Sequence, residues 1–167
     1  MLGCEHARAG RVWLDLYAGG AASTKERGMV SEDNKAVVLL ALRHWKDKNL
    51  PAFFDLIHDE ATYLLPYLPE RFQYGGSHNK ADTVAVLTEW RSAFERFALD
   101  VVSATAEADR VVVEFTVAAE GPGSATYRNR VCFAVLLKDG KMHTIHEFFD
   151  PFKVLAYVEQ VQFGAAR

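Results

Sequence analysis

The chain has 167 residues, of which 50 % are hydrophobic, and a formal net charge of −3. A chain of this length can bury about 70 % of its unfolded surface around one core, so we expect one main domain. The lysines and arginines form no basic stripe, and no apolar run approaches the roughly 20 residues that cross a bilayer. These features argue against nucleic-acid and membrane partners and make the cytoplasm the default location.

The first 30 residues show no sustained periodicity and are interpreted as an N-terminal extension before a domain over residues 31–162. Ser31 can cap a helix, and two acidic residues after it suit a first helical turn. Two interpretations of residues 1–30 stand side by side. Either Met29 is the natural start of the protein, or the segment is a flexible arm that docks Trp13 on the domain.

Helical signals dominate the first half of the domain. Apolar residues recur at the i, i+3, i+4, i+7 spacing of an amphipathic helix that ends near residues 48–49: Val38, Ala41, Leu42 and Trp45. A short helix from Pro51 to residue 57 and a strand over residues 61–65 follow. After a loop over residues 66–77, a third helix begins near Asn79 and carries an apolar stripe of Val84, Leu87, Trp90, Phe94 and Phe97.

The second half of the domain has the composition of strands. Segments rich in Val, Phe and Thr are separated by short turn signals: residues 99–106, 110–119, 125–137 and 142–149. Such short connections predict antiparallel neighbours. Asp150 and Pro151 then suit the cap and first residue of a closing helix over residues 154–160. Helices followed by a meander indicate an α+β fold.

This order of elements, together with several local strings, resembles the SnoaL-like, nuclear-transport-factor-like superfamily of polyketide cyclases and ketosteroid-isomerase relatives. The resemblance covers about residues 33 to 160. The strings that carry it are Lys35-Ala36-Val37-Val38, Trp45-Lys46-Asp47-Lys48-Asn49-Leu50, Asp59-Glu60-Ala61-Thr62-Tyr63, Gly75-Gly76, Tyr127-Arg128-Asn129, Asp139-Gly140-Lys141-Met142 and His146-Glu147-Phe148-Phe149-Asp150.

The resemblance implies a cone in which a curved antiparallel sheet packs over three N-terminal helices and encloses an apolar cavity. It also implies a homodimer formed through the outer face of the sheet. Such cavities take small molecules, so a small apolar ligand is the expected partner. The aromatic residues available to line the cavity, or alternatively to fill the core, are Trp45, Tyr63, Trp90, Phe94 and Phe148.

The reactions known in the superfamily require particular residues, and this sequence departs from several of them. The positions that resemble the ketosteroid-isomerase acids fall near residues 64–65 and 131–132, which are not acidic. Of the Asp-Arg-Asp set of limonene-type epoxide hydrolases, only Asp150 has a counterpart. A cyclase-type reaction requires least, since one acid or base in an apolar cavity can drive ring closure.

Asp150 and His146 are therefore the candidate catalytic residues. They share a strand face with Phe148, but four residues span about 13 Å, so they cannot form a direct dyad. Asp150 also has a structural explanation as a helix cap, and His146 as a hydrogen-bonded strand residue. Asn129, expected to face the interior, and His78, on the loop near the expected cavity mouth, are further candidates for ligand contact.

Nothing in the spacing of His, Cys and acidic residues favours a metal, and no Gly-rich loop favours a nucleotide, so we expect neither metal nor cofactor. Two functions remain. The first is a cofactor-free cyclase or isomerase that acts on a lipophilic molecule by general acid-base chemistry. The second is a non-catalytic module that binds a ligand or a second copy of the chain. An epoxide hydrolase is the weakest alternative.

Overall fold

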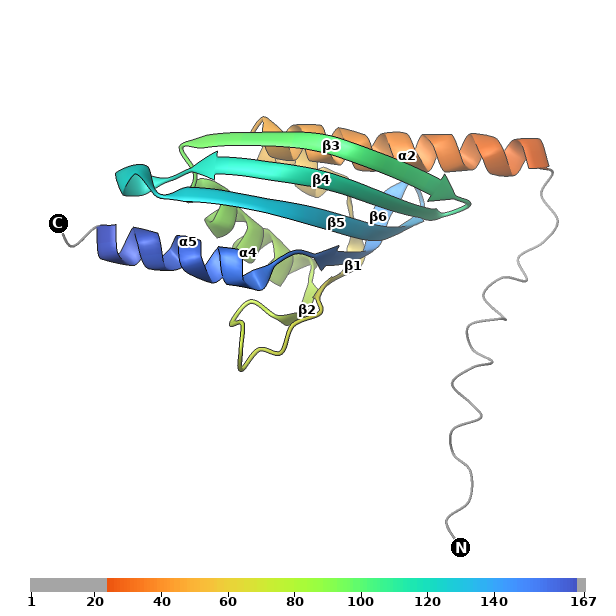
Figure 1. The fold of residues 1–167 in the computed structure, drawn as a ribbon. Coiled ribbons are helices and arrows are strands. Elements are labelled where there is room, and N and C mark those ends of the chain that lie inside the picture. Colours follow the sequence, from red (N-terminus) through yellow and green to blue (C-terminus); the bar gives the residue numbers. More distant parts are fainter. Residues whose placement is uncertain (1–23, 165–167) are drawn as a thin grey trace, which may run out of the picture.

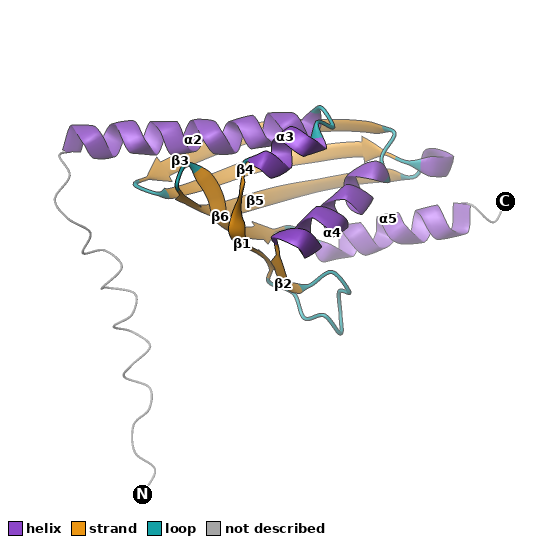
Figure 2. Ribbon diagram, turned by 180° about the vertical axis from the view of Figure 1, so that it is seen from behind, coloured by secondary structure: helices purple, strands orange, loops and turns teal. Residues whose placement is uncertain are grey.

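The computed structural model describes residues 24–164, so most of the predicted N-terminal extension lies outside the described residues. The described residues form an α+β fold in which a curved six-stranded sheet carries helices on its concave face (Figure 1, Figure 2). The elements follow in the order α2 (Thr24–Lys46), α3 (Leu50–Asp55), β1 (Ile57–Leu65), β2 (Gly76–Asn79), α4 (Lys80–Ser92), β3 (Arg96–Glu107), β4 (Arg110–Glu120), η1 (Pro122–Ser124), β5 (Thr126–Lys138), β6 (Lys141–Phe148) and α5 (Pro151–Gly164).

The strands are ordered β2-β1-β6-β5-β4-β3 across the sheet. All neighbouring pairs are antiparallel except β1 and β6, which run parallel. The prediction of an entirely antiparallel sheet is therefore wrong at one pair. The last strand of the meander, β6, runs beside β1 in the same direction. A second correction concerns β2, which pairs with β1 in a segment interpreted as mostly loop.

The helix bounds agree with the sequence pattern at some ends and differ at others. Asn79 caps α4, and its Oδ1 accepts a hydrogen bond from the Asp82 N–H at 3.0 Å. The prediction that the apolar stripe stays helical as far as Phe97 is wrong, since α4 ends at Ser92. The prediction that Ser31 caps the first long helix is also wrong, because α2 begins seven residues earlier.

The core lies on the concave face of the sheet, where every second residue of β4 and β5 is buried. In the register between these strands, Phe115 lies opposite Val131 and Val113 opposite Phe133. Period-two alternation sends the intervening residues to the convex face, where Glu114 and Arg130 form an ion pair. One face of the sheet is therefore free to shape an interior site.

A buried arginine holds α4 against the end of α2. Arg91 is 5 % exposed, and its guanidinium donates to the carbonyl oxygens of Trp45 and Lys46, each at 3.0 Å. The guanidinium carbon also lies 4.3 Å from the centre of the Phe97 ring. The Trp45 carbonyl oxygen also accepts a hydrogen bond from the Lys48 N–H at 3.2 Å, so Arg91 adds a second donor there. It supplies a donor to the Lys46 carbonyl oxygen as well, because the last carbonyls of a helix have no partner within the helix.

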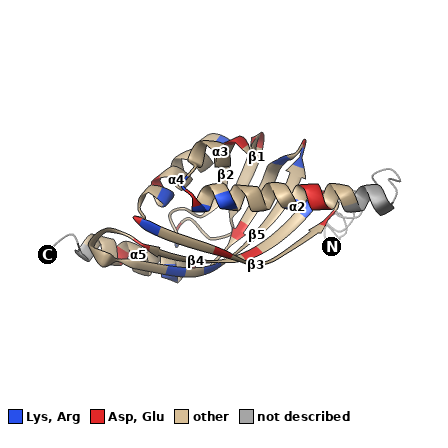
Figure 3. Ribbon diagram, turned by 90° about the horizontal axis from the view of Figure 1, so that it is seen from above, with Lys and Arg blue, Asp and Glu red and all other residues tan. Residues whose placement is uncertain are grey.

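The surface of the described residues mixes charges of both signs, as Figure 3 shows along the strands and helices. Among those residues, no helix is both long enough and apolar enough to span a membrane.

Candidate functional site

A cavity of about 370 Å³ lies between the concave face of the sheet and the helices. This volume falls within the range of small-molecule sites. Its wall is built mainly from aromatic and aliphatic side chains of the sheet, of the helices and of the segments that connect them. These include Trp45, Phe53, Tyr63, Leu65, Phe72, Trp90, Phe115, Val117, Tyr127, Val131, Phe133, Phe149, Val154 and Tyr157. Polar side chains in the wall are few, and each therefore has strong influence on how a ligand is oriented.

Glu147 is one of two acidic residues in this wall. It lies opposite Phe133 in the β5–β6 register and shares a strand face with buried Ile145. The residue as a whole is half-buried, and its carboxyl group is withdrawn from water. A second acid of the wall, Glu89, is an exposed residue.

The phenol of Tyr63 donates a hydrogen bond to Oε2 of Glu147. The two side chains come from β1 and β6, the parallel pair of the sheet. Burial raises the pKa of Glu147 to about 7, and the hydrogen bond from Tyr63 opposes part of that rise. Burial also raises the pKa of Tyr63 well above its ordinary value, so Tyr63 stays protonated and remains a donor.

The end of β6 beyond Glu147 is held by a second tyrosine. Tyr67 accepts a hydrogen bond from the Phe149 N–H at 2.7 Å and donates one to the Phe149 carbonyl oxygen. Its ring also packs against Phe72 and Phe149, with centroids 5.6 and 5.0 Å away. These contacts restrain the backbone that carries Glu147, and a fixed position is what proton transfer requires.

A carboxyl group with a pKa near 7 exists in both protonation states at neutral pH. It can accept a proton from a bound molecule or return one, and the Tyr63 phenol, whose single hydroxyl proton is donated to Glu147, stabilises the ionised carboxylate. The geometry therefore permits acid-base chemistry on an apolar ligand.

The family model of the SnoaL-like domain matches residues 25–145. The chain belongs to this family. No protein with a curated description matches its sequence at a significant level.

Several solved structures share the fold of this SnoaL-like chain. PrhC from Penicillium brasilianum is 14 % identical, with a TM-score of 0.71 over 82 % of this chain and 93 % of that protein. TerC, co-crystallised with polyporic acid, is 18 % identical, with a TM-score of 0.66 over 76 % of this chain and 98 % of the other. An NTF2-like protein from Burkholderia xenovorans is 15 % identical, with a TM-score of 0.59 over 75 % and 95 % of the two chains.

Of the residues that sequence analysis proposed for ligand contact, the cavity wall of the SnoaL-like domain includes Trp45, Tyr63 and Trp90. Phe94 is buried behind the wall, where its ring packs against Trp90 with centroids 4.9 Å apart. Phe148 is 44 % exposed and lies opposite Cys132 of β5, on the convex side of the sheet. The proposed ring set is therefore divided between the cavity, the core and the outer face.

The two proposed polar contacts have structural partners. Asn129 is buried, and its Nδ2 donates to the Tyr127 hydroxyl at 3.0 Å and to the Asp150 carbonyl oxygen at 2.9 Å. His78 is half-buried, and its Nε2 lies 2.9 Å from the carbonyl oxygen of Tyr74. Neither side chain belongs to the cavity wall, but each forms a hydrogen bond with a residue of the wall: Asn129 with Tyr127, and His78 with Tyr74.

The proposed catalytic pair also lies outside the cavity wall. Oδ1 of Asp150 accepts a hydrogen bond from the Phe152 N–H at 3.0 Å, which makes Asp150 the cap of α5. His146 lies opposite Ala134, on the strand face that also carries exposed Phe148. Neither residue therefore reaches the cavity. Glu147, the residue that follows His146 on the strand, belongs to the cavity wall instead.

The sequence around Glu147 carries a signal of its position. Ile145 is the kind of residue that a core requires, and strand alternation places residues 145, 147 and 149 on one face. A charged residue between two large apolar residues of the same face is a candidate for a buried, functional carboxyl group.

Proposed function

We propose that this SnoaL-like domain binds a small lipophilic molecule in its cavity and transfers a proton on it, in a cyclase-type or isomerase-type reaction. Glu147 is the acid-base group and Tyr63 is the hydrogen-bond donor beside it. The observation that carries the proposal is a carboxyl group with a pKa of about 7 in the wall of a mainly apolar cavity. Catalytic pKa values near the working pH favour such transfer.

Two further observations support a small-molecule ligand. The cavity volume of about 370 Å³ matches a compact ring system better than a peptide or nucleic acid. TerC, which has the same fold, was co-crystallised with polyporic acid. The identity between the two chains is 18 %, so this likeness supports the class of ligand and not its structure.

The proposal can be tested by hydrogen–deuterium exchange at the carbon next to a ketone group. A panel of lipophilic cyclic ketones is incubated with the protein in D₂O and followed by NMR, and binding is measured in parallel by quenching of tryptophan fluorescence. We expect the wild-type protein to bind at least one ketone and accelerate its exchange. Glu147→Gln should bind the same ketone and lose the acceleration.

The control for this experiment is Glu159→Gln, which removes an exposed carboxyl group outside the cavity wall and should leave exchange unchanged. Exchange that survives Glu147→Gln would refute the role of Glu147. Binding without exchange in the wild-type protein would instead favour a carrier, the second candidate. That candidate is favoured by the hydrogen bond between Tyr63 and Glu147, which leaves the pair satisfied without a substrate.

A further inference from the structure

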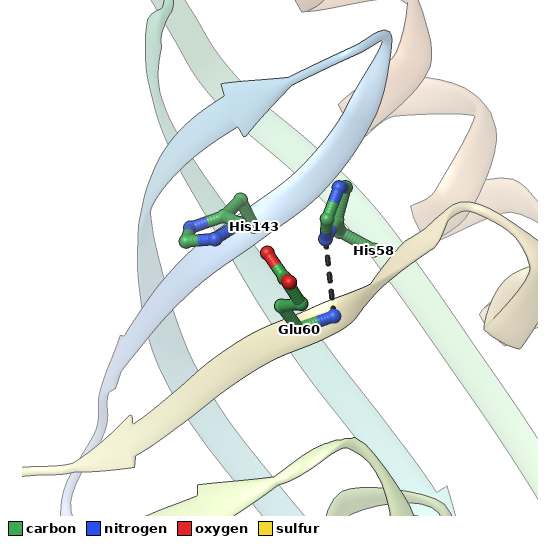
Figure 4. Close-up of side chains that lie close together, drawn as sticks. All are labelled: His58, Glu60 and His143. Carbon is green, nitrogen blue, oxygen red and sulfur yellow. Dashed lines mark hydrogen bonds between the residues drawn. The ribbon is translucent and has the colours of Figure 1, made fainter.

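Three potential metal ligands, His58, Glu60 and His143, come together away from the cavity. Their ligand atoms all lie within 4.8 Å of one another, and the two imidazole rings have centroids 5.0 Å apart. Figure 4 shows the Glu60 carboxylate placed between the two rings, with His58 and Glu60 on β1 and His143 on β6. The cluster therefore joins two strands that are far apart in the sequence.

Irregular pairing between the strands creates this arrangement. Ile57 of β1 lies opposite Met142 of β6, and the next paired residue on β1 is Thr62, opposite Thr144. Five steps along β1 thus face two steps along β6, so the segment that carries the first two ligands bows out of the ladder. His143 is itself the extra residue of β6 relative to β5. Bulges of this kind redirect side chains, and here they direct three ligand-type groups to one point.

We propose that His58, Glu60 and His143 bind one divalent transition-metal ion of the Zn²⁺ type. Two imidazoles and a carboxylate form a donor set that suits zinc and its neighbours and suits calcium or magnesium poorly. Ligand bonds of about 2.0–2.2 Å at tetrahedral angles place ligand atoms roughly 3.4 Å apart. The observed separations of up to 4.8 Å require only side-chain rotation, which the half-buried rings and exposed carboxylate allow.

Some groups around the cluster compete with an ion for its ligand atoms, and another can help to bind the ion. Lys138 donates to Oε2 of Glu60 at 3.1 Å, which leaves Oε1 available. The Glu60 N–H donates to Nδ1 of His58 at 3.0 Å, and coordination through that nitrogen would release this exposed N–H to water. Oδ2 of Asp139 lies 3.8 Å from Nε2 of His58, so a modest movement would bring this oxygen to the ion as a fourth ligand.

This site is separate from the proposed reaction, since none of the three ligands belongs to the cavity wall. It nevertheless lies on β1 and β6, the strands that carry Tyr63 and Glu147. An ion bound there would cross-link these strands at their bulged ends. The expected consequence is a more stable fold, because a ligand that binds only the folded state stabilises it.

The test is isothermal titration of the untagged, full-length protein with ZnCl₂ in a buffer that does not chelate. We expect one ion per chain and a higher melting temperature in its presence. His58→Ala, His143→Ala and Glu60→Gln should each weaken binding by at least about tenfold, since even the loss of an outer partner of a ligand costs roughly that much. His44→Ala, a half-buried histidine of α2 outside the cluster, serves as the matched control and should bind like the wild-type protein.

Glu60→Gln keeps the size and exposure of the side chain, so this variant remains folded and informative even if a histidine variant does not. Failure of the wild-type protein to bind Zn²⁺ would overturn the proposal. So would binding that survives all three substitutions, because the ion would then be held elsewhere, for example by Cys4 and His6 of the N-terminal segment. Neither outcome bears on ketone exchange, so this proposal and the proposed function fail separately.

Discussion

Replacing Glu147 by glutamine should stabilise the protein in a way that depends on pH. The folded state raises the pKa of Glu147 from 4.5 to about 7, so the folded protein holds this proton more tightly than the unfolded chain does. Raising the pH through this window therefore removes stability from the wild-type protein. The glutamine side chain of the variant has no proton to lose, while its carbonyl oxygen can still accept the Tyr63 hydrogen bond.

The magnitude follows from the two pKa values. Each tenfold change in proton affinity corresponds to about 1.4 kcal/mol, so ionising Glu147 costs the folded state up to about 3 kcal/mol relative to the unfolded chain. Below about pH 4.5 this cost is absent, and above about pH 7 it is complete. Other effects of the substitution are the same at both pH values and cancel in the comparison.

The measurement is urea unfolding of both proteins at pH 4.5 and pH 8, followed by circular dichroism. We expect the free energy of unfolding of Glu147→Gln, minus that of the wild-type protein, to rise by about 2–3 kcal/mol between the two pH values. Glu89→Gln removes an exposed acid, and its difference from wild type should change by less than about 0.5 kcal/mol. A Glu147→Gln difference that is equal at both pH values would refute a raised pKa.

Four further predictions concern other parts of the molecule. In Tyr63→Phe, the pKa of Glu147 should rise above its wild-type value, because the lost hydrogen bond favoured the ionised form. NMR titration of the glutamate carboxyl carbon measures this pKa, and a value lower than that of the wild-type protein would contradict the assigned pairing. Arg91→Met removes the donor to the Lys46 carbonyl and one of the two donors to the Trp45 carbonyl, and should cost about 1–3 kcal/mol in urea unfolding, whereas a loss under about 0.5 kcal/mol would show that water replaces the guanidinium. Asp150→Ala should cost about 1 kcal/mol through loss of the α5 cap, with Asp150→Asn close to wild type in the same assay; equal losses would point to the charge instead of the cap. If the convex sheet face forms a homodimer, Phe148→Asp should convert it to monomer in light scattering after size exclusion, and an unchanged mass would place the contact elsewhere or show that none exists.

Much of the architecture was accessible from the sequence, because hydrophobic periodicity reports directly on burial. The strands β4 and β5 and the start of a helix near Asn79 depend on local sequence, and the structure confirms them. The end of α4 was not accessible in the same way. Phe94 and Phe97 continue the helical spacing beyond Ser92, yet Phe97 lies in β3, where it pairs with Ala119 of β4.

The site was harder to predict because it depends on strand parity. His146 and Glu147 are adjacent in the sequence, and a shift of one residue exchanges the cavity face for the convex face. Asp150 was predicted to be catalytic because it matches the acid of a family motif. Its position before Pro151 also predicted a helix cap, which is the role that the structure shows. The cluster of His58, Glu60 and His143 could not be predicted from spacing, since it depends on a bulge between strands that are distant along the chain.

The parallel pairing of β1 with β6 also has a consequence for how the protein folds. The hairpins β3–β4, β4–β5 and β5–β6 join neighbouring segments, whereas the hydrogen bond from Tyr63 to Glu147 closes a loop of 84 residues. Long-range contacts of this kind form late, since the entropy of loop closure is lost before the contact stabilises the chain. A meander formed on its own would therefore lack the cavity chemistry, and the protonation of Glu147 would report in real time on the closure of this loop.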